Sequence, residues 1–218
     1  MLSILESLSR AIGNFFLVVL MLSGSVLLTQ CSGTSVGELF GLDTLGEPIV
    51  ELEINYKSSR RTVAKLRKYR GKGAVTLKID SFGGSVVFGH DIIEEIKYLQ
   101  ANGTIVTCIA DQAMSMGFTI LQYCDLRYAY PDALIMQHMP HNGNGFENMV
   151  FRTEESKVQY AFFVRLHGED EARRLGIPYS IYIRRYMYSK WYKGKEACRD
   201  RVIDGIIDYN GNIKRCSK

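Results

Sequence analysis

The sequence predicts an α/β domain of repeated βα units with a mainly parallel sheet, preceded by an N-terminal hydrophobic helix. Segments typical of strands and of helices alternate along residues 49–188, and residues 11–28 carry no charge. Such alternation is typical of βα units whose strands run parallel. The expected organisation is a signal peptide or membrane anchor at 1–30, a Gly/Ser/Thr-rich linker at 31–47 and a folded domain at 48–218.

The elements of the folded domain follow from the spacing of apolar residues. Strands are expected at 49–55, 74–80, 104–110, 126–130 and 133–138. Helices are expected at 59–70, 87–101, 115–123, 147–166 and 178–188. The segment TIVTCIA at 104–110 is almost entirely apolar or β-branched, which is typical of a strand that is buried on both faces.

Composition and charge narrow the function classes. The 218 residues are 46% hydrophobic and 23% charged, which is enough to bury a full core. A net charge of +4 is too small to indicate nucleic-acid binding. The five cysteines contain no CxxC pair, so neither a metal nor a redox site is expected, and no cofactor is indicated. Their odd number does not suggest a disulfide framework, although Cys198 and Cys216 could at most form one pair.

The uncharged run at 11–28 is 18 residues long, near the minimum for a helix that spans a bilayer. Arg10 precedes it and no Lys or Arg follows before Lys57, which favours a cytoplasmic N-terminus and an exported domain. We therefore expect membrane association through 11–28 and a membrane-anchored or periplasmic location. The alternative is a packing arm in a cytoplasmic oligomer.

Three motifs indicate one site. Gly83 and Gly84 directly follow a predicted strand, and paired glycines let backbone N–H groups approach a ligand, although a turn can need them for geometry alone. Ser115 stands where a buried strand meets a helix. Unpaired N–H groups there can activate a serine and hold an oxyanion, but an ordinary capping serine is the simpler interpretation.

The third motif is His138, which ends a predicted strand within IMQHMP. Its imidazole can accept a proton near neutral pH, because the reference pKa of histidine is about 6.5. His141 is a rival base, and the remaining histidines are His90 and His167. A single histidine is more often structural, so the prediction depends on the joint order of glycine turn, serine and histidine.

The runs LKIDSFGGSVVFGHDIIEEIKYL and TIVTCIADQAMSMGFTILQYCDLRYAYPDALIMQHMP resemble the proteolytic subunit of the Clp protease (ClpP), in the ClpP/crotonase superfamily. The similarity is clear over about 49–140 and fainter to the end of EACRDRVIDGIID. It implies a serine endopeptidase with Ser115 as nucleophile, His138 as general base and an oxyanion hole at Gly84 and Met116. It also implies peptide or protein substrates, self-association and no cofactor.

One position departs from this resemblance. The family carries its triad aspartate about seven residues before the EA pair, and Ser189 stands there. Loss of an orienting acid costs up to about 10⁴ in rate. Three outcomes remain open: Ser189 or a carbonyl orients His138 in a slow dyad, Glu147 or Asp200 substitutes for the acid, or catalysis is lost.

Other side chains bear on the same question. Lys190 and Lys193 raise a Ser–Lys variant, and Cys108 is expected in the core rather than as a reactive thiol. Residues 57–72 hold eight basic residues and no acid, which indicates a solvated helix face or contact with anionic lipid. Residues 182–195 interleave aromatic and basic side chains, for which an amphipathic helix is preferred to single-stranded nucleic-acid binding.

The leading hypothesis is thus an ATP-independent serine peptidase that is exported or membrane-anchored. A second is a catalytically impaired subunit or scaffold that keeps the fold, because the triad aspartate is missing. A third is a crotonase-type enzyme acting on acyl-CoA, in which the same oxyanion hole would stabilise an enolate. A cytoplasmic location would restore an unfoldase partner of the kind that the resemblance implies.

Overall fold

The computed structural model describes residues 48–51, 53–138, 154–186 and 188–217. The expected signal or anchor, the linker and the start of the helix expected at 147–166 lie outside the described residues. Within the described ranges, no helix is both long and apolar enough to cross a membrane.

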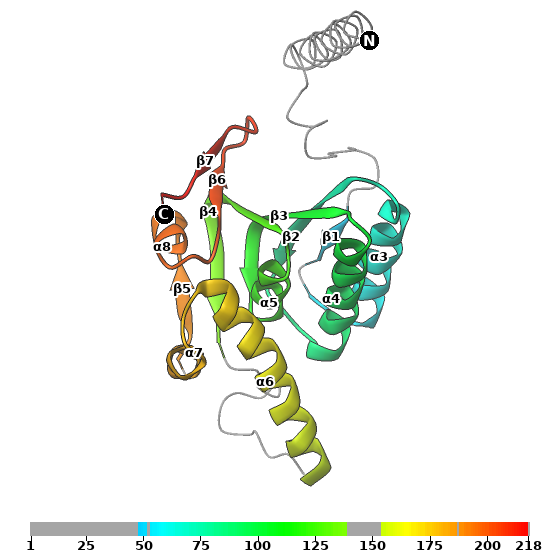
Figure 1. Ribbon diagram of the computed structural model, residues 1–218, viewed down its shortest axis with the longest axis vertical. Helices are drawn as coiled ribbons and strands as arrows, with labels where there is room; N and C mark the ends of the chain where they lie inside the picture. The colour runs from blue at the N-terminus through cyan, green and yellow to red at the C-terminus, as the bar shows by residue number, and fades with distance from the viewer. Residues whose placement is uncertain (1–47, 52, 139–153, 187, 218) are drawn as a thin grey trace, which may run out of the picture. The chain divides into compact units, whose positions relative to one another are not determined.

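The described strands are β1 (Ile49–Val50), β2 (Ala74–Ser81), β3 (Ile105–Met114), β4 (Leu126–Gln137), β5 (Lys190–Tyr192), β6 (Gly205–Ile207) and β7 (Ile213–Arg215). The helices are α3 (Tyr56–Leu66), η1 (Arg67–Tyr69), α4 (Val86–Ala101), α5 (Met116–Gln122), α6 (Glu154–Leu175), α7 (Tyr179–Tyr186) and α8 (Gly194–Arg199). From β1 to α7 the described elements follow the predicted order, and β5, α8, β6 and β7 come in addition (Figure 1).

In the described part of the chain, the strands form one seven-stranded sheet in the order β1-β2-β3-β4-β6-β7, with β5 also paired to β4. The neighbours β1, β2, β3, β4 and β6 pair in parallel, whereas β5 and β7 pair antiparallel. The predicted α/β class with a mainly parallel sheet is confirmed. Because β2, β3 and β4 run in the same direction, their carboxyl ends meet at one edge, where loops of α/β sheets bind ligands.

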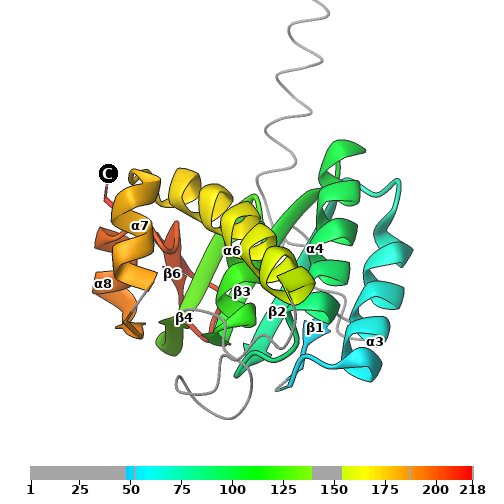
Figure 2. The same cartoon turned by 90° about the horizontal axis from the view of Figure 1, so that it is seen from below.

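Helices cover one face of the sheet. Helix α5 packs on β2, β3 and β4 and lies between α4 and α6, and Figure 2 shows α6 running across the sheet from α7 towards α4. Alternate residues of β3 serve two cores: Cys108 and Ala110 join the large core, whereas Ile109 packs in a small cluster with Tyr128 and Ile207. The prediction that this strand is buried on both faces is confirmed, because each face packs in its own core.

The structure corrects several element boundaries. The two strands expected at 126–130 and 133–138 are one strand, β4, whose register against β3 shifts between Ala110 and Gln112. Pro131 falls within that irregular stretch, where a missing N–H costs no ladder hydrogen bond. The strand expected at 49–55 is shorter, and beyond β1 it keeps only a parallel bridge between Ile54 and Gly84.

Candidate active site

Ser115 occupies the tight turn between β3 and α5 in a strained backbone conformation. Its φ of 51° and ψ of −118° are rarely adopted by residues other than glycine. Its N–H donates to the Met136 carbonyl at 2.9 Å, and its own carbonyl accepts from Thr119 N–H at 3.2 Å. Its hydroxyl makes no capping hydrogen bond. The interpretation of Ser115 as an ordinary capping serine is therefore wrong. Backbone hydrogen bonds hold the turn, and the side chain of this half-buried serine takes no part in the cap.

The turn at Gly83 and Gly84 packs directly against Ser115. Both glycines have positive φ, 101° and 137°. A Cβ on Gly83 would lie 2.6 Å from the Ser115 Cβ and 3.2 Å from the Met116 nitrogen, so only glycine permits this approach. The turn and the first amide of α5 are consequently neighbours.

The bridge with Ile54 fixes the direction of the Gly84 amide. Ile54 donates to the Gly83 carbonyl at 2.7 Å and accepts from Ser85 N–H at 2.8 Å. In a parallel bridge of this pattern, the residue between the two bonded neighbours points its own N–H away from the partner. The Gly84 N–H therefore faces away from Ile54, and Gly84 is exposed.

His138 directly follows the last residue of β4 and is half-buried. Strands β3 and β4 are parallel neighbours with Met114 opposite Met136. Ser115 and His138 therefore leave the carboxyl ends of adjacent strands, one and two residues beyond that pair. The rival His141 lies outside the described residues.

Ser189 lies on the other side of β4. Strand β5 pairs antiparallel with β4, and Lys190 stands opposite Gln137. One step further in the same register, Ser189 stands opposite His138. Since β3 and β5 flank β4 on opposite edges, His138 lies between Ser115 and Ser189, which is the order nucleophile, base and orienting group of a triad.

Asp200, the alternative acid, and Lys190, one of the two alternative amines, are bonded to each other. Although burial raises the pKa of Asp200, hydrogen bonds from Lys190 and Arg199 lower it below the ordinary value. Lys190 is held by Asp200 and lies near the Tyr192 ring, and Lys193 is an exposed residue at the start of α8. These contacts disfavour a Ser–Lys pair, and Glu147 lies outside the described residues.

The other two histidines form a separate cluster between α4, α5 and α6. The rings of His90 and His167 are 5.5 Å apart, and His167 Nδ1 lies 3.0 Å from the Tyr123 hydroxyl. That hydroxyl donates to Asp170 at 2.8 Å. Burial lowers the pKa of His167 to about 4, with the charge of His90 contributing, so this imidazole is neutral at physiological pH. Both histidines belong to helix packing.

A buried carboxyl on α6 escaped the sequence prediction. Glu171 is fully buried and accepts a hydrogen bond from the Tyr182 hydroxyl. Burial raises the pKa of Glu171 to about 7, although the bond from Tyr182 opposes this shift. No spacing in the sequence distinguishes this glutamate from the exposed acids around it, since the burial arises from the packing of α6 on α5 and α7.

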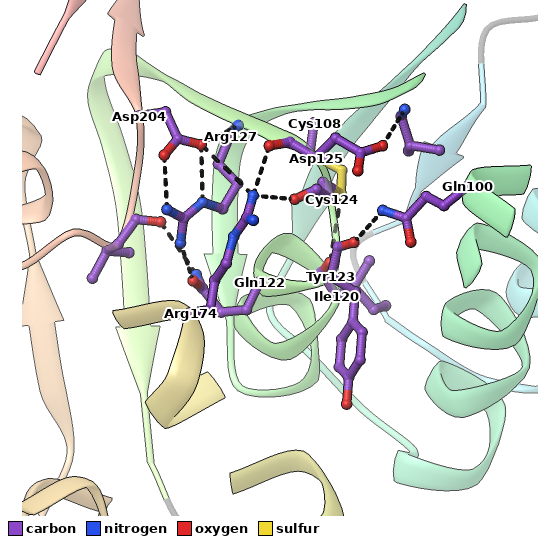
Figure 3. The surroundings of a disulfide bond; sticks show 12 residues. Gln100, Cys108, Ile120, Gln122, Tyr123, Cys124, Asp125, Arg127, Arg174 and Asp204 are labelled. Atoms are coloured by element: carbon purple, nitrogen blue, oxygen red, sulfur yellow. Dashed lines mark hydrogen bonds and ion pairs between the residues drawn. A yellow bond between two sulfur atoms is a disulfide. The ribbon is translucent and has the colours of Figure 1, made fainter. Parts of the chain in front are cut away.

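The structure contains two disulfides, one of which contradicts the expectation of at most a single pair. Cys198 and Cys216 are joined, as the sequence allowed, and so are Cys108 and Cys124 (Figure 3). The turn at Ser115 folds α5 back beside β3, which brings Cys108 and Cys124 to a Cα separation of 5.9 Å. Both sulfurs are buried in the core, so Cys108 is a core residue as expected. The bond closes a loop that contains Ser115.

The two aromatic and basic stretches are also resolved. Residues 182–195 form the end of α7, β5 and the start of α8 rather than one amphipathic helix, with Tyr182 and Tyr192 buried. The basic run at 57–72 is partly neutralised within the domain. Arg61 pairs with Glu51, and the buried Glu95 pairs with Arg67 and Arg70.

A parallel α/β sheet that presents a strained serine, a double-glycine turn and a histidine at its carboxyl edge defines a hydrolase-like architecture. The family model for Clp protease matches residues 49–160. The chain therefore belongs to the Clp protease family, and it is a Clp-protease-like peptidase in general terms. Domains of this family typically act as oligomers on protein substrates. The matched range includes Gly84, Ser115 and His138 and ends before Ser189.

Proposed function

We propose that the protein is a serine endopeptidase in which Ser115 is the nucleophile and His138 the general base. The conformation of Ser115 is the observation that carries this proposal. A non-glycine residue at φ 51° stores strain of about 1–3 kcal/mol, which persists where the surroundings over-determine it and is frequent at active sites. Here the surrounding constraints are the Met136 carbonyl and the glycine turn.

Peptide hydrolysis follows from these positions. His138 takes the hydroxyl proton as the Ser115 oxygen attacks the scissile carbonyl carbon, and the carbonyl electron pair moves to oxygen. The amides of Gly84 and Met116 stabilise this oxyanion. Its collapse breaks the C–N bond, and the amine leaves with the proton from His138. Water, deprotonated by His138, then hydrolyses the acyl-enzyme and regenerates the Ser115 hydroxyl.

Ser189 replaces the charged third member of a triad. A serine hydroxyl can accept the imidazole N–H and favour one tautomer, but it cannot stabilise the imidazolium by charge. We therefore expect slow turnover compared with an enzyme that has an acid in this position.

We further propose an exported or membrane-anchored peptidase that works without ATP. The uncharged run at 11–28 supports export, and the two disulfides support an oxidising compartment, because such bonds are rare in the cytosol. An extracytoplasmic site lacks ATP, so an ATP-driven unfoldase partner would be absent there. Fractionation of a tagged chain tests this location: recovery in the cytosolic fraction with free thiols would contradict it.

A catalytically impaired subunit is the second candidate function, and Ser189 is the observation that favours it. Such a subunit would keep the fold and its self-association but would not hydrolyse peptides. Residual activity that depends on Ser115 separates the two proposals.

A fluorophosphonate probe provides the decisive assay on the full chain. We expect labelling of the wild-type protein, loss of labelling in Ser115→Ala, and a large decrease in His138→Ala. The matched control is Ser180→Ala, an exposed serine on α7 whose replacement should leave labelling unchanged. Equal labelling of the wild type and Ser115→Ala, or no labelling of either, would rule out Ser115 as the nucleophile and favour the second candidate.

A further inference from the structure

A cavity of about 780 Å³ lies at the amino end of β4, beside α8 and the end of β7. His138 follows the carboxyl end of the same strand, so this cavity is separate from the candidate active site. Its charged lining consists of five arginines and two aspartates: Arg127, Arg174, Arg199, Arg201, Arg215, Asp125 and Asp204. The lining therefore has a surplus of three positive charges.

One pair forms a neutral, rigid part of the wall. Arg127 is buried and donates to both carboxylate oxygens of Asp204, at 3.0 and 2.8 Å, and to Gln122 at 2.6 Å (Figure 3). These bonds use three of the five N–H groups of the guanidinium, one on each nitrogen. Arg127 and Asp204 consequently fix the geometry of the wall without contributing net charge.

Arg174 adds a positive charge that is only partly compensated. Its Nη2 donates to the main-chain carbonyls of Cys124 and Asp125, both at 2.6 Å, and it lies 4.0 Å from Asp204 (Figure 3). Burial lowers the pKa of Arg174, and the charge of Arg127 lowers it further. Asp204 and Asp125 attract this guanidinium and partly offset the repulsion from Arg127, so its charge is reduced but not cancelled.

Arg201 and Arg215 complete the surplus. Both are exposed, and neither makes a side-chain hydrogen bond or ion pair within the described residues. Arg199, by contrast, pairs with Asp200 at 3.0 Å. The disulfide between Cys198 and Cys216 ties together the two backbone segments that carry Arg201 and Arg215, so both side chains start from the same wall of the cavity.

We propose that this cavity binds a phosphate group with at least two negative charges, held by Arg174, Arg201 and Arg215. Guanidinium forks match the oxygens of phosphate in paired hydrogen bonds. With Arg199 paired to Asp200 and Asp125 counted, Arg174, Arg201 and Arg215 leave a surplus of two positive charges. A single carboxylate would neutralise only one of them, whereas a phosphate monoester or diphosphate neutralises both. The volume lies within the range of small-molecule sites and admits an organic group beyond the phosphate.

The test compares the full chain with a double variant, Arg201→Asn and Arg215→Gln. Asparagine suits position 201, because the φ of Arg201 is 60°. The control is Arg60→Gln with Arg184→Gln, two exposed arginines on α3 and α7 whose loss changes the net charge equally. Pyrophosphate binding is measured by calorimetry and by the rise in melting temperature, against sodium chloride at equal ionic strength.

We expect pyrophosphate to stabilise the wild type and the control, and to bind the double variant about tenfold or more weakly. Vesicles of phosphatidylcholine with and without phosphatidic acid distinguish the source of the phosphate. Vesicle binding that requires phosphatidic acid and both Arg201 and Arg215 indicates a lipid headgroup. If the two arginines are required for pyrophosphate binding but not for vesicle binding, the ligand is soluble. Equal affinities of the double variant and the control, or no binding beyond the salt effect, would overturn the proposal.

Discussion

Replacing Ser189 by aspartate should accelerate the reaction of Ser115. The pairing of β5 with β4 places position 189 opposite His138, so a carboxylate there would face the imidazole from the side away from β3. Two unit charges 4 Å apart attract by about 1 kcal/mol in water and about 4 kcal/mol near a protein surface. Because Ser189 is exposed, we expect about 1–3 kcal/mol in the transition state, which is about a 5- to 150-fold increase in rate.

The assay is the second-order rate constant for fluorophosphonate labelling between pH 6 and 9. Asparagine is the matched control, since Ser189→Asn offers a similar hydrogen-bond acceptor without the charge. The aspartate variant should label faster than both the wild type and Ser189→Asn, with the controlling pKa shifted upwards by the added charge. If folded aspartate and asparagine variants label at the wild-type rate, position 189 does not contact the base and the triad geometry is wrong.

Three other predictions follow from the packing around the site. Replacing Cys108 and Cys124 by alanine opens a loop of 16-residue separation and should lower the free energy of unfolding by about 3 kcal/mol in urea titrations; an unchanged midpoint would show that the bond does not form. The raised pKa of Glu171 stabilises the folded state below the unfolded pKa of 4.5, and this stability is lost as the pH rises through about 7. The Glu171→Gln variant should therefore gain up to about 3 kcal/mol relative to the wild type between pH 4.5 and 7.5, and a constant difference would contradict this. Gly83→Ala should lower the free energy of unfolding by at least about 2 kcal/mol and abolish fluorophosphonate labelling, because its Cβ would lie 2.9 Å from a backbone oxygen. The control Gly73→Ala, which has open space around it, should change neither quantity.

The sequence predicted the parallel α/β fold because its strands and helices have clear periodicities and sharp boundaries. Strand β2, helix α4 and helix α5 lie within a residue or so of their expected ranges. The strands β5, β6 and β7 and the short helix α8 were not predicted, since three- to six-residue elements carry too little periodicity. The two strands expected at 126–130 and 133–138 join into β4, because a register shift against β3 accommodates the residues between them.

The candidate site was predictable only as a set of residue types in order. The positive φ of Ser115 and the close approach of Gly83 arise from how two turns meet, which no local pattern encodes. The pairing of Cys108 with Cys124 depends on α5 folding back beside β3, and an odd cysteine count concealed it. The arginine-lined cavity combines residues from four separate segments, so it too required the tertiary structure.

The most direct test of the proposed Ser115–His138 pair is modification by a peptidyl chloromethyl ketone followed by peptide mapping. Such a reagent alkylates an imidazole nitrogen most readily when a neighbouring serine hydroxyl has added to its ketone. We predict one adduct, on His138, that disappears in Ser115→Ala. Alkylation of His90 or His167 instead, or an adduct on His138 that forms equally fast without the Ser115 hydroxyl, would contradict the pairing.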